Sequence, residues 1–67
     1  MRDRLQQLVA EMVDKGIRYE DARREFDRQF LTSVVNRCDG NVGKAAALLG
    51  VHRNTLTRRL QELKIRR

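Results

Sequence analysis

The chain has 67 residues, a formal net charge of +6, one cysteine, one histidine and no proline. A chain of this length forms one domain at most and buries only about 60% of the surface that its unfolded form exposes, so a partner subunit would add to its marginal stability. A single cysteine excludes an intramolecular disulfide, and with one histidine it cannot form a zinc site. We therefore expect no metal and no cofactor.

The apolar residues limit where the chain can act. The longest uninterrupted apolar run is AAALL, which is far shorter than the roughly 20 residues that cross a membrane and shorter than a signal-peptide core. We therefore expect a cytoplasmic protein without membrane contact.

The positive charge is concentrated in the C-terminal part of the chain. Residues 1–39 contain eight basic and eight acidic side chains, whereas residues 40–67 contain seven basic side chains and one acidic side chain. A surface for an anionic partner is therefore expected in residues 40–67.

Two amphipathic helices are predicted in the neutral part. Residues 2–15 carry an apolar stripe at helical spacing, and Gly16 favours a stop. Residues 19–38 carry a wider apolar face, and their charged side chains, Arg28 among them, are expected to form surface ion pairs. A wide face indicates contact on two sides, so we predict that both helices bury surface within a subunit and across a homodimer interface. The predicted interface residues are Leu5, Leu8, Val9, Met12, Val13, Phe26 and Phe30.

Two short helices are predicted in the basic part. Asn41 is placed to cap a helix over about 42–49, and a helix over about 52–63 follows the turn at Gly50. A short connection with glycine between two helices is typical of a helix-turn-helix. Ala46 supplies the small side chain that a close helix contact needs, and Gly50 tolerates positive φ. The other side chains expected to point inward are Ala45, Leu48, Leu49, Val51, Leu56, Leu60 and Leu63.

The outer face of the last helix carries side chains that read bases. In steps of 100° per residue, Asn54, Arg58 and Gln61 lie opposite the leucines. Arginine pairs with guanine, asparagine or glutamine with adenine, and the threonine methyl group contacts thymine. We predict base contacts from Asn54, Thr55, Thr57 and Arg58, and from Arg53 at the helix start. Phosphate contacts are predicted from the helix N-termini and from Asn41, Lys44, His52, Arg59, Lys64, Arg66 and Arg67.

The stretch GNVGKAAALLGVHRNTLTRRLQEL resembles the helix-turn-helix of the Fis family, and RNTLTRRLQEL is similar to the C-terminal DNA-binding domain of NtrC-type enhancer-binding activators. The similarity extends over about 19–65. It implies an all-α, four-helix homodimer in which residues 1–39 form the dimerisation helices and residues 40–67 form the helix-turn-helix part. The fourth helix then enters the major groove, often with bending of the DNA. The family positions that contact DNA correspond to Asn41, Arg53, Thr55 and Arg58.

Two positions depart from the family pattern. His52 stands at the N-cap of the reading helix, where Ser, Asn or Gly is more frequent, so either the first turn frays without DNA or the histidine contacts phosphate itself. Gly43 replaces a polar residue, which removes one side-chain contact to phosphate. The receiver and ATPase domains of NtrC-type activators have no counterpart in the sequence. The chain is accordingly either a stand-alone binder or one domain of a larger regulator, and further candidate partners are RNA polymerase or a regulatory domain.

These features predict that the chain binds double-stranded DNA and that the DNA sequence influences this binding. The chain would act as a transcription regulator or as the DNA-binding domain of one. A nucleoid-type DNA-bending protein and a helical oligomerisation module are the alternatives. A binder of single strands or RNA would stack bases on aromatic rings, yet Tyr19, Phe26 and Phe30 all lie in the neutral part. We do not expect an enzyme, because the sequence contains no phosphate loop, metal cluster or paired acid and base.

Overall fold

Residues 2–64 are the part of the chain that the computed structural model describes. They form four helices, α1 (Arg2–Asp14), α2 (Tyr19–Arg37), α3 (Val42–Leu49) and α4 (Arg53–Glu62), and no strand occurs among them. The all-α prediction is confirmed, and each predicted helix is found over nearly the residues expected.

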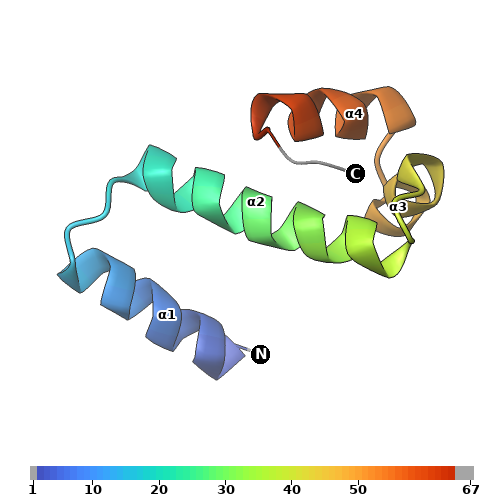
Figure 1. The fold of residues 1–67 in the computed structure, drawn as a ribbon. Coiled ribbons are helices and arrows are strands. Elements are labelled where there is room, and N and C mark those ends of the chain that lie inside the picture. The colour runs from blue at the N-terminus through green and yellow to red at the C-terminus, as the bar shows by residue number, and fades with distance from the viewer. Residues whose placement is uncertain (1, 65–67) are drawn as a thin grey trace.

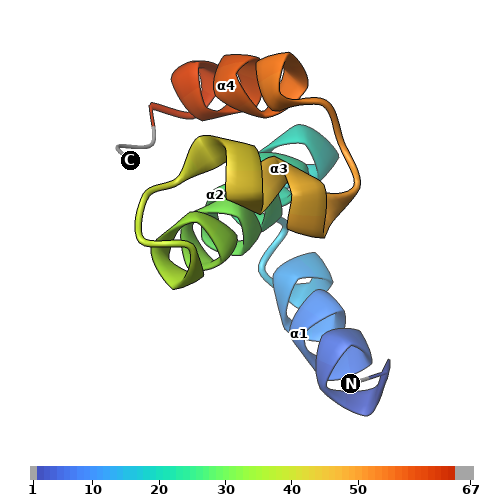
Figure 2. The ribbon, with the colours of Figure 1, turned by 90° about the vertical axis from the view of Figure 1, so that its right-hand side faces the viewer.

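The long helix α2 connects two different parts of the molecule. In Figure 1, α4 lies along one side of α2, and α3 joins the C-terminal end of α2 to α4. Helix α1 lies on the other side of α2, and the second view shows it projecting away from the remaining helices (Figure 2). Helices α1 and α4 are therefore separated by α2.

Glycine residues end two of the helices, as the sequence predicts. Gly16 follows α1 with a φ of 72°, and Gly50 caps α3 with a φ of 73°. After Gly50, the N–H of Val51 donates to the carbonyl of Ala46 at 3.1 Å. A residue without Cβ adopts this left-handed backbone at little cost, so the chain can reverse direction tightly between α3 and α4.

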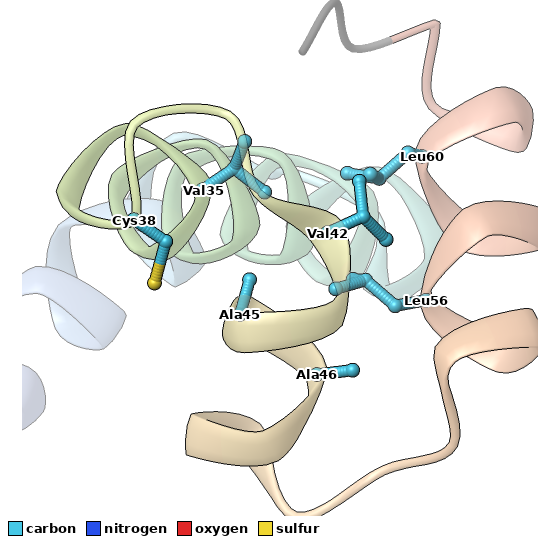
Figure 3. Close-up of a cluster of buried hydrophobic side chains, with 7 residues drawn as sticks. All are labelled: Val35, Cys38, Val42, Ala45, Ala46, Leu56 and Leu60. Carbon is cyan, nitrogen blue, oxygen red and sulfur yellow. The ribbon is translucent and has the colours of Figure 1, made fainter.

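A small hydrophobic core lies where α2, α3 and α4 meet (Figure 3). Ala45 and Ala46 are 0% and 2% exposed, so their small side chains let α3 pack closely against both neighbours. Leu31, Val34 and Leu49 are half-buried around this cluster, and Leu63 is buried at the end of α4. The cluster itself consists of Val35, Cys38, Val42, Ala45, Ala46, Leu56 and Leu60.

Two residues predicted to point inward do not do so. Leu48 is 70% exposed and Val51 is 42% exposed. Leu48 lies about 110° from the centre of the inward stripe of α3 in steps of 100° per residue, and Val51 lines an open groove beyond the turn instead of closing the angle between helices. The inward stripe consists of Val42, Ala45, Ala46 and the half-buried Leu49.

Helix α1 buries none of its residues. Its apolar stripe and part of α2 line an open groove of about 550 Å³ that is almost entirely apolar. On α2, the rings of Phe26 and Phe30 lie 5.4 Å apart between centroids and are about half exposed. The predicted interface residues are exposed except for Met12, which is half-buried. Exposed apolar surfaces of this kind are typical of protein interaction sites.

Candidate nucleic-acid interface

The side chains of α4 divide into a buried face and an exposed face. Leu56 and Leu60 fill the core, whereas Arg53, Asn54 and Arg58 are exposed. Asn54 and Arg58 are one helical turn apart on the side opposite the core, and Arg53 lies at the first turn. Three of the residues predicted to contact bases are therefore available to a partner, because the packing of α4 does not use them.

The flanks of α4 hold the remaining predicted contacts. Thr55 and Thr57 are half-buried. Thr55 and Arg59 line the open groove between α4 and α2, and Nη1 of Arg59 lies 3.9 Å from Oε1 of Glu62. Thr55 and Arg59 thus lie nearer α2 than Asn54 and Arg58 do.

His52 fills the N-cap of α4. Its Nδ1 accepts a hydrogen bond of 3.0 Å from the backbone N–H of Asn54, so the first turn is capped without DNA. The proton of the neutral ring is then on Nε2, which can donate to a phosphate oxygen. The fraying considered for the first turn is therefore not found, and capping and a phosphate contact by His52 are compatible because they use different nitrogens.

The start of α3 is also exposed. Oδ1 of Asn41 accepts from the N–H of Lys44 at 3.0 Å, which confirms Asn41 as the cap, and the amide nitrogen of the same side chain can still donate. Both side chains are exposed, while Val42 is buried. Helix α3 is thus fixed by its own core residue and presents polar groups at its N-terminal end.

Lys64 follows α4 with a φ of 57°, a left-handed backbone that a lysine adopts at a cost. Its side chain is exposed. Arg66 and Arg67, predicted to contact phosphate, lie outside the described residues. Residues 40–64 alone carry five basic side chains and one acidic side chain, Glu62, so the surface around α4 is cationic.

One contact between distant parts of the chain was missed from the sequence. Nη2 of Arg28 in α2 donates a hydrogen bond of 2.9 Å to the carbonyl oxygen of Leu63, the C-cap of α4. Residue types within α2 suggested ion pairs, and one such pair is present between Arg23 and Glu20 at 3.5 Å. Nothing in a local pattern identifies a bond between residues 35 positions apart.

Known proteins are similar to this chain in sequence. The family described as bacterial regulatory protein, Fis family, matches residues 22–63. A putative Fis-like DNA-binding protein of Xylella fastidiosa strain Temecula1 is 48% identical over 44 residues, which are 66% of this chain and 49% of that protein. The DNA-binding transcriptional regulator NtrC of Escherichia coli K12 is 39% identical over 62 residues, which are 84% of this chain and 13% of that protein. No solved structure matches the chain significantly.

The chain belongs to the Fis family of bacterial regulatory proteins, and residues 22–63 are its helix-turn-helix DNA-binding domain. The chain spans about half the length of the Fis-like relative and a small part of NtrC. Within residues 2–64, no helix is long and apolar enough to cross a membrane.

Proposed function

We propose that the chain binds double-stranded DNA as a homodimer, with α4 of each subunit in a major groove, and thereby regulates transcription. The observation that carries this proposal is the division of α4 into two faces. Leu56 and Leu60 hold the helix in the core, and Asn54 and Arg58 point away from it. An arginine and an asparagine on an exposed helix can form bidentate contacts with guanine and adenine.

The exposed groove between α1 and α2 supports the dimer. Phe26 and Phe30 leave about half of their surface in water, and α1 buries nothing within the subunit. Such side chains carry much of the stability of protein interfaces. A symmetric dimer through this surface would present two copies of α4, and each would meet a half-site about one helical turn of DNA from the other.

The role proposed for each residue follows from its position in the helix-turn-helix. Arg53, Asn54, Arg58 and the threonines would contact bases, and the cationic residues around them would contact phosphates. His52 would donate from Nε2 and Asn41 from its amide nitrogen, because their acceptor atoms are already used as caps. With such a DNA-binding role, the protein would act at the nucleoid in the cytoplasm.

The test is a titration of labelled duplex DNA of about 25 base pairs, long enough for two half-sites, followed by fluorescence anisotropy over a series of salt concentrations. A dimer that makes about six to eight phosphate contacts gives a slope of log K against log salt of about −5 to −7. On a sequence selected by the wild type, Arg58→Ala and Arg53→Ala are each expected to lose about 1 to 3 kcal/mol of binding free energy.

A matched control separates readout from charge. Arg18→Ala removes the same charge from the connection before α2, where the side chain is exposed, and it should leave sequence preference unchanged. DNA reading by α4 would be excluded if the affinity for duplex DNA did not change with salt concentration. It would also be excluded if the arginine variants of α4 bound as tightly as the wild type. The exposed apolar groove between α1 and α2 would then favour a helical oligomerisation module.

A further inference from the structure

Helix α4 is held at both of its ends, by two different kinds of attachment. At its N-terminal end, the turn at Gly50 ties it to α3. At its C-terminal end, Arg28 of α2 donates to the carbonyl of Leu63. Among residues 2–64, this is the only hydrogen bond that joins α2 to α4 or its cap. A helix attached at one end can pivot about that attachment, whereas a helix attached at both ends has a defined orientation.

The chemistry at this second attachment is favourable. The last carbonyls of a helix have no partner within the helix and carry the negative end of its dipole. A guanidinium group placed there supplies a charge-assisted hydrogen bond with a defined direction. The neighbouring Lys64 adopts a φ of 57°, so the chain turns away directly after the carbonyl that Arg28 contacts.

The other contacts between α2 and α4 near this end constrain the orientation of α4 less strongly. Leu60 and Leu63 are buried, but apolar burial is non-directional and tolerates small rotations. Beside them lies an open groove of about 330 Å³ lined by charged side chains such as Asp27 and Arg59. The ion pairs found among residues 2–64 lie within α2 or within α4 and none joins the two helices, so these side chains do not lock α4 against α2.

Arg28 also lies at a particular angle on α2. In steps of 100° per residue, it is about 180° from the mean direction of Phe26 and Phe30. One face of α2 therefore carries the surface proposed for the partner subunit, and the opposite face carries the contact to α4. A shift of α4 against α2 would change the distance between the two copies of α4 in a dimer.

We propose that Arg28 is a positioning residue that sets the direction of α4 relative to α2 and so determines which half-site spacing the dimer accepts. This inference rests on the proposed function, namely a dimer that reads DNA through α4. Arg28 touches no base in this proposal. It acts through the carbonyl of Leu63, and its loss lets α4 pivot about the turn at Gly50.

The experiment compares Arg28→Met, which keeps an apolar stem but has no donor, with Arg24→Met, which removes the same charge from an exposed site on the same helix. The probes are duplexes that carry two copies of the half-site selected by the wild type, with the centre-to-centre distance changed in single base-pair steps around one DNA turn. A duplex with one half-site is measured in parallel. Circular dichroism verifies that each variant is folded.

The wild type and Arg24→Met are expected to lose about tenfold in affinity when the spacing departs by two base pairs from the optimum, since half-site spacing is set by the geometry of the dimer. Arg28→Met is expected to lose less than about threefold over the same change, with its affinity for the single half-site retained. A merely structural role would instead weaken binding to every duplex alike. Hydrogen exchange at the Leu63 and Lys64 amides, measured without DNA, is expected to be faster in Arg28→Met.

Uniform weakening of Arg28→Met on every duplex contradicts the positioning role, and two further results would overturn the inference in distinguishable ways. If folded Arg28→Met binds duplex DNA and its affinity depends on half-site spacing as that of the wild type does, the positioning role is contradicted but the proposed function is not. Absence of duplex binding by the wild type contradicts the proposed function and this inference with it. If Arg28→Met does not fold, Arg28→Ala replaces it, because alanine also lacks a donor and favours the helix, and an unchanged spacing profile in that variant equally overturns the inference.

Discussion

Residues 2–30 and residues 31–64 bury very different amounts of apolar surface. No side chain in residues 2–30 is buried, although this part contains both phenylalanines and the apolar stripe of α1. Residues 31–64 contain the whole core, built largely from alanine, valine and leucine. Both phenylalanines thus lie where the single chain does not bury them. The C-terminal part is therefore stabilised within one subunit, whereas the N-terminal part would be covered by the partner in the proposed dimer.

The largest effect should come from removing a central side chain of the core. Leu56 is 1% exposed, so Leu56→Ala is expected to lower the free energy of unfolding by about 2 to 5 kcal/mol through lost burial and the cavity left behind. Urea unfolding followed by circular dichroism measures this change. The matched control is Leu48→Ala in exposed surroundings, which should change stability by less than about 0.5 kcal/mol. Equal losses for the two variants would contradict the position of the core.

A charge in the apolar groove tests the dependence on a partner. Phe30→Asp is expected to weaken the dimer by about 2 kcal/mol or more, because a carboxylate would replace a half-exposed ring at the proposed interface. Sedimentation equilibrium measures the monomer–dimer constant. Arg24→Gln changes the net charge by the same amount on the other side of α2 and should leave that constant unchanged. A Phe30→Asp protein that dimerises like the wild type would show that the partner lies elsewhere.

A substitution at the cap of α4 separates stability from binding. Asp accepts from the backbone as His52 does and favours a helix N-terminus by charge, so His52→Asp should keep or raise stability by up to about 1 kcal/mol. The same carboxylate would repel a nearby phosphate, so duplex affinity should fall. Thermal unfolding and anisotropy on the same sample check both changes. Unchanged affinity would remove His52 from the list of phosphate contacts.

The smallest effect concerns the first turn of α3. A Cβ at Gly43 would meet no atom closer than Oδ1 of Asn41 at 3.5 Å, an ordinary contact. Gly43→Ala is therefore expected to stabilise the domain by about 0.5 to 1 kcal/mol through lower backbone entropy in the unfolded chain. This gain should raise the melting temperature by a few degrees. A lower melting temperature would indicate that α3 has less room at its start than its contacts suggest.

Local signals in the sequence were sufficient for the helices. Asn41, Gly50 and Gly16 act on their immediate neighbours, and their effects on helix ends do not depend on tertiary packing. The leucine spacing in α4 likewise identified the buried face, because ten residues cover nearly three turns.

The features that the sequence predicts wrongly or does not reveal have physical reasons of their own. Helix α3 has only 8 residues, so its few apolar positions do not fix the inward direction, and Leu48 was assigned to the wrong side. Arg28 and Leu63 come together only through the packing of α2 against α4, which no local pattern encodes. The proposed DNA contacts also depend on a second molecule. The sequence predicts which residue types contact DNA, but not which base or phosphate each residue contacts.

The division of α4 into two faces also has a consequence for how such a protein can change over time. Asn54 and Arg58 contribute nothing to the core, and Leu56 and Leu60 are not available to a partner. In the proposed DNA complex, substitutions on the outer face would therefore alter the preferred binding sequence without loss of stability. With DNA read in this way, one scaffold could acquire new target sites through single-residue steps, each of which leaves a folded protein.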